Sequence, residues 1–313
     1  MVSDRPVAIV VGASRGIGRQ IAISLSDAGY AVVVSSKSDT LPTADAPFPP
    51  DPNSSASTIH TVNREIRERG GIVLAVPVDT RDPTSIKSLF EASGNQFGRL
   101  DVLVYNAGAI WWSSIANTPF KRFKLMQEVN VEGLYAAIQE SLPWFEKGNW
   151  KGRVIVVSPP IYSRFFRGKT AYAMGKVGMS ILTKGLAMDW KREDKVNMAI
   201  TSIWPASAIE SAATQKTAHD NLESRKDLRT AHIFADAILA MLRAKPDVVN
   251  GLLDTDEDFL RRQCGMTDFS KYSLVEGSQP RRIMPAEFPT LEVAEQDDEG
   301  RRMDSMKIKA SKL

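Results

Sequence analysis

Cysteine is almost missing from this chain of 313 residues, since Cys264 is the only one. One cysteine excludes a framework of disulfides within the chain and fits a reducing compartment. No group of residues resembles a metal cluster, and the first residues lack the apolar core of a signal peptide. No apolar run is long enough to span a bilayer. The sequence therefore predicts a soluble protein without a metal site or a membrane span.

An excess of one charge is also missing, because 40 Lys and Arg residues face 37 Asp and Glu residues, for a formal net charge of +3. The two signs are largely interspersed, which gives no reason to expect a nucleic-acid partner. What the chain does have is length and apolar content. Its 313 residues, of which 43% are hydrophobic, suit one large α/β domain or two small ones with a sizeable core.

A glycine-rich loop follows the first predicted strand. Residues 7–11 form a short apolar, β-branched run, which is typical of a parallel strand covered on both faces. Apolar residues then recur at helical spacing up to Gly29. Glycines let a backbone approach a pyrophosphate, and a helix N-terminus directs free N–H groups at it. The loop therefore predicts a dinucleotide site, with contacts from Gly12, Ser14, Arg15, Gly16, Ile17 and Gly18.

The end of the second predicted strand, residues 31–34, indicates which dinucleotide binds. Ser35, Ser36 and Lys37 follow it, whereas an NAD site usually has an acidic residue there to bind the adenosine ribose. Arg15 and Lys37 are available for a 2′-phosphate instead, with Ser36 beside them. The sequence predicts NADP(H), against the alternative that both cations are ordinary surface charges.

Residues 38–57 contain five prolines and many small polar residues, which excludes a helix or an internal strand. We interpret them as an exposed loop inserted in the domain. This loop either lies near the adenosine end of the cofactor or is a spacer without function.

Helices and strands then alternate, with helices predicted over 58–69 and 83–97 and strands over 72–78 and 100–105. This alternation predicts an α/β fold, a Rossmann-type doubly wound parallel sheet with helices on both faces. Ligands of such sheets lie beyond the carboxyl ends of the strands. The polar residues that fall at these ends are Asp79, Asn106, Ala107 and Gly108.

Two further helices carry candidate catalytic residues. Thr118 and Pro119 are predicted to open a long helix, as N-cap and first-turn proline, that contains Asn130. In a helix beginning near residue 170, Tyr172 and Lys176 stand four residues apart and so lie on one face. A cation about 4 Å away attracts a phenolate by roughly 4 kcal/mol before desolvation, so Lys176 is expected to lower the tyrosine pKa. Alone, the pair also fits a solvated helix face.

Taken in order, these segments resemble the short-chain dehydrogenase/reductase family over residues 6–254, and the ordered combination is far more specific than any one motif. The resemblance implies a dinucleotide-binding catalytic domain over residues 1–254. It implies an adenine contact for Asp79 and a strand-end motif at Asn106-Ala107-Gly108. The proline-rich insert, together with residues 158–160 and 204–209, makes the chain more similar to the peroxisomal hydroxysteroid dehydrogenase-like proteins. Unlike some of those, it is expected to end without a sterol-carrier domain.

The resemblance also implies a mechanism, in which nicotinamide exchanges a hydride with a carbonyl or alcohol carbon of the substrate. Tyr172 transfers the hydroxyl proton, while Lys176 holds the nicotinamide ribose and lowers the tyrosine pKa. Asn130 positions a water that links Lys176 to solvent. Together these residues would be three members of the family's catalytic tetrad.

The fourth member, a serine, is the main departure from the family. Its usual position falls on Pro159, and Ser158 occupies the preceding one. Simple strand alternation turns Ser158 away from the cleft. The Pro-Pro pair and a slightly longer loop before Tyr172 are expected to turn Ser158 inward, where it would hold the substrate oxygen. Tyr105 is a second departure, in place of the first asparagine of Asn-Asn-Ala-Gly.

The segment after residue 204 is expected to close over the site. By resemblance, Pro205, Ile209 and Ser211 cover the nicotinamide, and residues 211–230 form either a mobile substrate lid or an ordinary connecting helix. The final core elements are predicted as a helix over 231–243 and a strand around 248–253.

The C-terminal part changes in composition. Residues 255–285 are expected to pack on the domain as a short extension, and residues 291–313 to be disordered. The last three, Ser311-Lys312-Leu313, match the peroxisomal targeting signal, which predicts the peroxisomal import receptor as a partner and the peroxisome as the location.

The predicted compartment narrows the substrate. Because peroxisomes process acyl-CoA thioesters, a fatty acyl-CoA or another lipid carbonyl is the leading expectation. Two alternatives stay open, namely a carbonyl reductase of specialised metabolism and a cofactor-binding protein without turnover. A homo-oligomer is left open as well.

Overall fold

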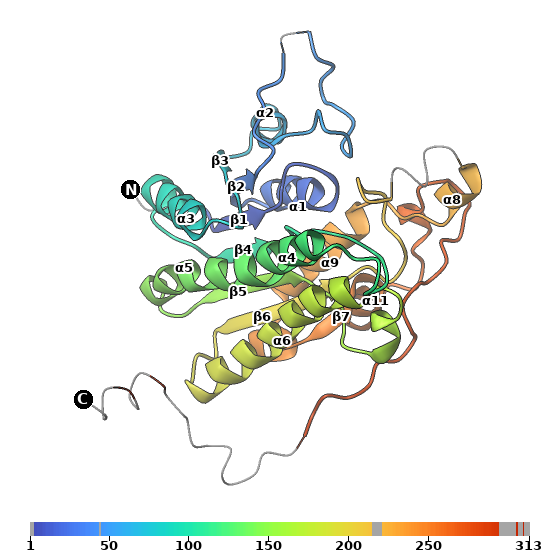
Figure 1. Cartoon of the computed structure of the whole chain (residues 1–313). Coiled ribbons are helices and arrows are strands. Elements are labelled where there is room, and N and C mark those ends of the chain that lie inside the picture. Colours follow the sequence, from blue (N-terminus) through green and yellow to red (C-terminus); the bar gives the residue numbers. More distant parts are fainter. Residues whose placement is uncertain (1–2, 44, 215–220, 294–304, 306–308, 310–313) are drawn as a thin grey trace.

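The computed structural model describes residues 3–43, 45–214 and 221–293, together with residues 305 and 309. Seven strands of this part of the chain form one sheet in the order β3-β2-β1-β4-β5-β6-β7, and all neighbours are parallel (Figure 1). The strands are β1 (Val7–Val11), β2 (Ala31–Ser36), β3 (Val73–Pro77), β4 (Val102–Tyr105), β5 (Gly152–Val157), β6 (Met198–Trp204) and β7 (Leu253–Thr255). The predicted Rossmann-type α/β fold is confirmed.

Helices cover both faces of the sheet, which explains why the strands are continuously apolar. One face carries α1 (Gly16–Asp27), α2 (Ile59–Glu68), α9 (His232–Arg243) and α11 (Asp256–Cys264). The other carries α3 (Pro83–Phe97), α5 (Gly133–Lys147) and α6 (Thr170–Arg192), with α4 (Phe120–Gln127) against α6. Side chains along β1 alternate between the two cores, because neighbouring strand residues point to opposite faces.

Short helical segments complete the described ranges. They are α8 (Leu222–Lys226), α10 (Pro246–Val249), a π-helical turn (Glu128–Glu132) and two 3-10 turns (Ser163–Phe166 and Ser270–Tyr272). None of the helices in these ranges is long and apolar enough to cross a membrane.

The order of the strands reverses beside β1, which pairs with β2 on one side and β4 on the other. Val11 at its end is in register with Ser35 of β2 and Tyr105 of β4. The glycine loop and the strand-end residues are therefore brought to one edge. Ligands of open α/β sheets bind at such a reversal.

Two predicted boundaries are wrong. The helix predicted from Thr118 begins at Phe120 with Pro119 as its N-cap, because the Thr118 hydroxyl donates to the Ser114 carbonyl at 2.7 Å instead of capping. The strand predicted around residues 248–253 is also displaced. Pro246 starts the short helix α10, as a proline at the first helical position favours, and the strand β7 begins only at Leu253.

The proline-rich insert, residues 38–57, is exposed along most of its first half and projects from the sheet (Figure 1). Its last residues pack against the glycine loop. The Gly16 N–H donates to the Pro52 carbonyl at 2.8 Å, and the Ser57 hydroxyl donates to the Ser14 carbonyl at 2.7 Å. Asn53 and Ser57 are buried. The interpretation of the whole insert as an exposed loop is thus wrong for these residues, which support the glycine loop.

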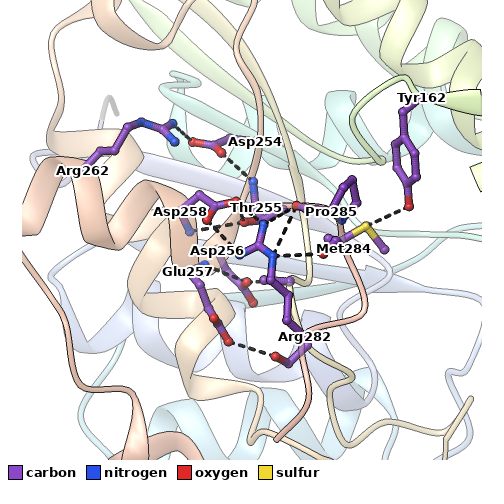
Figure 2. A network of polar contacts seen from close by, with 12 residues as sticks. Tyr162, Asp254, Thr255, Asp256, Glu257, Asp258, Arg262, Arg282, Met284 and Pro285 are labelled. Atoms are coloured by element: carbon purple, nitrogen blue, oxygen red, sulfur yellow. Dashed lines mark hydrogen bonds and ion pairs between the residues drawn. The ribbon is translucent and has the colours of Figure 1, made fainter. Parts of the chain in front are cut away.

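The chain after β7 packs back onto the sheet. Arg282 donates two hydrogen bonds to the Asp258 carboxylate, at 2.8 and 2.6 Å, and further ones to the carbonyls of Met284 and Pro285 (Figure 2). The Ile283 N–H donates to the Ala206 carbonyl at 2.8 Å. The predicted domain boundary at residue 254 therefore cuts through β7 and separates parts that contact one another. The targeting tripeptide Ser311-Lys312-Leu313 lies outside the described residues.

Candidate active site

A cleft of about 710 Å³ opens at the carboxyl ends of β1 to β4. Most of the residues predicted to contact the cofactor line it: Gly12, Ser14, Arg15, Gly16, Ile17, Ser36, Lys37, Asp79, Asn106, Ala107, Gly108 and Ser211. Gly18, Tyr172, Lys176, Pro205 and Ile209 are not among its lining residues. The cleft also contains residues that the sequence analysis did not single out, among them Ser38, Thr80 and Arg81.

The glycine loop has the close packing that a pyrophosphate cradle requires. Gly12 has φ +88°, and a side chain there would lie 2.7 Å from the Ala107 nitrogen. A side chain on Gly18 would collide with the Gly12 carbonyl, so Gly18 serves beneath the turn instead of in the cleft. Asn106 donates its amide to that same carbonyl at 2.9 Å. These residues fit a dinucleotide, since only glycines leave the backbone accessible there.

Three cations and one carboxylate meet at the adenosine end. The Arg81 guanidinium donates to both oxygens of Asp79, and the Lys37 ammonium lies 3.1 Å from one of them. The hydrogen bonds from Arg81 hold the pKa of Asp79 well below its usual range. Arg15 donates to the Ser38 hydroxyl at 3.1 Å. One carboxylate leaves an excess of positive charge, which is what a phosphate group requires. Arg81 was not expected at the site from the sequence. Its position two residues after Asp79 is the signal that could have identified it.

Lys176 lies next to Gly108, a residue that lines the cleft, and has an exposed fraction of 4%. Its ammonium donates to the Val157 carbonyl at 2.9 Å, and burial lowers its pKa to about 7. A side chain added to Gly108 would lie 3.1 Å from the Lys176 ammonium and 3.4 Å from the Asn130 amide oxygen. Gly108, which has no side chain, therefore leaves room for both of these groups beside the cleft.

The π-helical turn positions Asn130. This buried side chain accepts from the Ala109 N–H at 2.9 Å and donates to the Ala109 carbonyl at 3.2 Å. The Tyr105 hydroxyl donates to the carbonyl of the preceding residue, Val129, at 2.6 Å. Tyr105, which departs from the family pattern, therefore supports the wide turn. Turns of this kind are frequent at functional sites.

Tyr172 has an exposed fraction of 2%. Its ring lies 6.2 Å from the rings of both Trp112 and Phe165, with Trp112 edge-on. Burial raises the pKa of Tyr172, and no charge offsets that rise. The prediction that Lys176 lowers this pKa is wrong for the protein alone, because the lysine ammonium is itself desolvated and is bonded to a carbonyl.

Ser158 is completely buried, and its hydroxyl has other partners than a substrate. It lies 2.8 Å from the Ser202 hydroxyl of β6 and accepts from the Ser180 hydroxyl of α6 at 3.0 Å. Ser180 also donates to the Pro159 carbonyl at 2.6 Å. Ser158 thus faces α6 one turn beyond Lys176. Its role at the substrate oxygen stays a prediction that this geometry disfavours.

The segment after β6 closes one side of the cleft. Ser211 lies against Gly16, and the Thr214 hydroxyl donates to the Ile209 carbonyl at 3.0 Å. Ile209 packs in the core, and Pro205 precedes Ala206, whose N–H donates to the Asp256 carboxylate at 2.8 Å. Residues 215–220 of the predicted lid lie outside the described residues.

A glycine loop at the strand reversal, with a tyrosine and a lysine one turn apart on the adjoining helix, defines a dinucleotide-binding protein with a proton-transfer site. A sequence profile described as short chain dehydrogenase matches residues 53–221, more than half of the chain. The chain belongs to the short-chain dehydrogenase/reductase family.

Individual relatives agree with this assignment. Hydroxysteroid dehydrogenase-like protein 2 of Pongo abelii is 34% identical over 270 residues, which cover 86% of this chain and 60% of that protein. The chain thus spans about 60% of the length of this relative. The crystal structure of a short chain dehydrogenase from Mycobacterium thermoresistibile is 33% identical with a TM-score of 0.75, covering 87% of this chain and 92% of that one. A 7α-hydroxysteroid dehydrogenase complexed with NADH and 7-oxo glycochenodeoxycholic acid is 26% identical with a TM-score of 0.64, covering 81% and 95%.

Proposed function

We propose that this protein is an NADP(H)-dependent oxidoreductase that interconverts a carbonyl and an alcohol group of a small molecule. The observation that carries the proposal is the position of Tyr172 and Lys176 on one face of α6, beside the inner end of the dinucleotide cleft. The nicotinamide, when bound, supplies or accepts the hydride. The protein's own side chains donate the proton, supply positive charge and position the site.

Tyr172 is the proton donor in the direction of reduction. Because burial raises its pKa, the hydroxyl keeps its proton until negative charge develops on the substrate oxygen. Lys176 supplies positive charge beside it, and with a pKa near 7 it exchanges protons at working pH. Asn130 holds the backbone of Ala109 through two hydrogen bonds. Tyr172 and Lys176 thus perform the acid–base part of the reaction, and Asn130 is a positioning residue.

The preference for NADP(H) rests on the adenosine end. Arg15, Lys37 and Arg81 line this part of the cleft, and Asp79 is the one carboxylate among its lining residues. Lys37 and Arg81 pair with Asp79, and no acidic residue follows β2 directly. The 7α-hydroxysteroid dehydrogenase bound to NADH shows that the fold also accepts NAD(H). The preference between the two cofactors therefore depends on the charged residues at the adenosine end. Affinity for NADPH should exceed affinity for NADH.

Lipid carbonyls are the proposed substrate class. The relatives are named for hydroxysteroids, and the ligand of one structure is an oxo bile acid. Ser311-Lys312-Leu313 supports a peroxisomal location, and with it an acyl-CoA or related lipid. Deleting the three residues should move the protein to the cytosol without changing its melting temperature. Unchanged peroxisomal fluorescence of the deleted form would refute this part.

The test of the activity is a screen of the purified chain with NADPH and with NADP⁺ against libraries of carbonyls, alcohols and acyl-CoA thioesters, followed by mass spectrometry. Turnover that disappears in Tyr172→Phe supports the proposal. A second candidate, a cofactor-binding protein without turnover, is favoured by the enclosed hydroxyl of Ser158. Tight NADPH binding without any product would establish it.

A further inference from the structure

Lys169 is the N-cap residue of α6, three positions before Tyr172, and shares its aromatic neighbours. Its ammonium lies 4.1 Å from the centre of the Phe165 ring and 5.9 Å from that of Trp112, the two rings that flank Tyr172. These two shared rings place the Lys169 ammonium on the same aromatic surface as Tyr172, at the N-terminal end of the helix that carries Tyr172 and Lys176.

A second cation lies across the same aromatic surface. The Arg122 guanidinium of α4 stacks on the ring of Trp111 at 4.7 Å, next to Trp112 in the chain. The helices α4 and α6 pack against each other (Figure 1). Trp111 and Phe165 belong to the same apolar cluster as Tyr172. Arg122 and Lys169 thus approach the tyrosine from two different elements.

Neither cation has an acidic partner in the part of the chain that the structure describes. Their neighbour Lys124, by contrast, pairs with Glu128 at 3.5 Å. The sequence explains the difference, because no Asp or Glu occurs from residue 102 to 127 or from 147 to 188. Lys169 is half-buried, and this burial lowers the pKa of its ammonium. A desolvated cation without a counter-charge is costly unless a ligand supplies one.

The surface between the cleft and these cations is apolar and open. Ile110, which lines the cleft, is followed by Trp112, Ile115 and Phe120, and all four side chains are exposed. Scattered exposed apolar residues are ordinary, but a row that begins in a cleft marks a binding surface. It suits an aliphatic chain that leaves the cleft beside Tyr172.

We infer that Lys169 and Arg122 bind an anionic group of the substrate, a carboxylate or a phosphate, while the exposed side chains of residues 110–120 receive its aliphatic part. The inference rests on the proposed function and narrows it from lipid carbonyls in general to oxo or hydroxy acyl compounds that carry a negative charge. Neutral steroids and simple ketones would be poor substrates.

The experiment compares three forms of one 3-oxoacyl chain in the presence of NADPH, namely the free acid, the CoA thioester and the neutral N-acetylcysteamine thioester. The wild-type protein should prefer a charged form, and Lys169→Met should lower the ratio of kcat/KM for charged over neutral forms about 10- to 100-fold, through KM, as expected for a charge-assisted contact. The methionine keeps the aliphatic stem against Phe165. Lys184→Met, which removes the same charge elsewhere on α6, should leave the ratio unchanged.

The outcomes separate this inference from the proposed function. Turnover of all forms with no preference for charge, or an equal loss for charged and neutral forms in Lys169→Met, overturns the anion site while the oxidoreductase stands. Preference for the acid over the thioester identifies a carboxylate, and the reverse a phosphate. If no form is reduced, the anion site is tested by calorimetry, which measures binding of the acid and of CoA to the NADPH-bound protein. Binding to the wild type and to Lys184→Met but not to Lys169→Met supports the anion site. Equal binding to the wild type and to Lys169→Met refutes it.

Discussion

The two ends of the cleft handle charge in opposite ways. At the adenosine end, Lys37 has a side-chain exposed fraction of 69% and pairs with Asp79, which Arg81 also contacts. At the reaction end, Lys176 and Tyr172 are almost completely buried, and neither forms an ion pair among the described residues. Water and salt screen exposed pairs, whereas burial shifts pKa values by several units. The first end is suited to recognise a phosphate, and the second to move a proton.

The largest effect should come from Tyr172→Phe. The phenyl ring keeps the contacts with Trp112 and Phe165, so fold and cofactor binding should persist. Loss of the transferable proton should lower kcat by about a thousandfold or more, within the range of general acid catalysis. Stopped-flow absorbance of NADPH measures the rate, and fluorescence titration checks the cofactor. Full activity would move the chemistry to another residue.

Lys176→Met should lower kcat about a hundredfold and also change stability in a pH-dependent way. The folded pKa of about 7 lies below the ordinary value of 10.5, so the native state gives up a proton that the unfolded chain keeps. The penalty of the buried charge is complete below about pH 7 and disappears as the pH rises toward 10.5. The melting temperature of the methionine variant should therefore exceed that of the wild type by more at pH 6 than at pH 9. An equal gain at both pH values would contradict a buried, titrating lysine.

At the adenosine end, smaller effects are expected because the charges are exposed. Arg81→Ala should weaken NADPH binding about tenfold with little change for NADH, and Lys37→Asp should erase or reverse the preference. Isothermal titration at two ionic strengths measures both, since higher salt should reduce the wild-type preference. Lys87→Ala, an exposed charge on α3, is the control. Equal affinity of the wild-type protein for NADPH and NADH would refute the proposed preference for NADP(H).

The smallest effect on rate is expected from Ser158→Ala, which tests whether the reaction end uses this hydroxyl. Because it bonds to Ser180 and Ser202, its removal should change kcat less than about threefold and cost about 1 kcal/mol in the free energy of unfolding. Urea unfolding and initial rates measure the two. A hundredfold loss of rate would show that Ser158 turns to the substrate after all.

The elements that the sequence predicted well carry local signals. Helix α3 matches its predicted range because Asp82 caps it, Pro83 opens it and Gly98 ends it with φ +71°. The glycine loop and the strand ends are contiguous segments, so most of the cofactor cleft could be located from them.

The rest depends on contacts between distant segments. Pro52 reaches Gly16, Tyr105 reaches Val129, and Ser158 finds its partners on β6 and α6. No pattern within a short window encodes such pairs. The raised pKa of Tyr172 has the same origin, because spacing places Lys176 on its helix face but does not reveal how deeply both are buried.

The packing of residues 281–288 sets where another domain could be fused to this one. Asp258 depends on Arg282 as its cation, and the Tyr162 hydroxyl contacts Met284 (Figure 2). The Ala206 carbonyl accepts from the Ile283 N–H, and the Tyr162 ring contacts that of Phe288. A protein shortened at residue 254 would lose all of these partners beside the loop that follows β6. The smallest portable unit therefore runs through Phe288, and a reporter or an additional module should be joined after it.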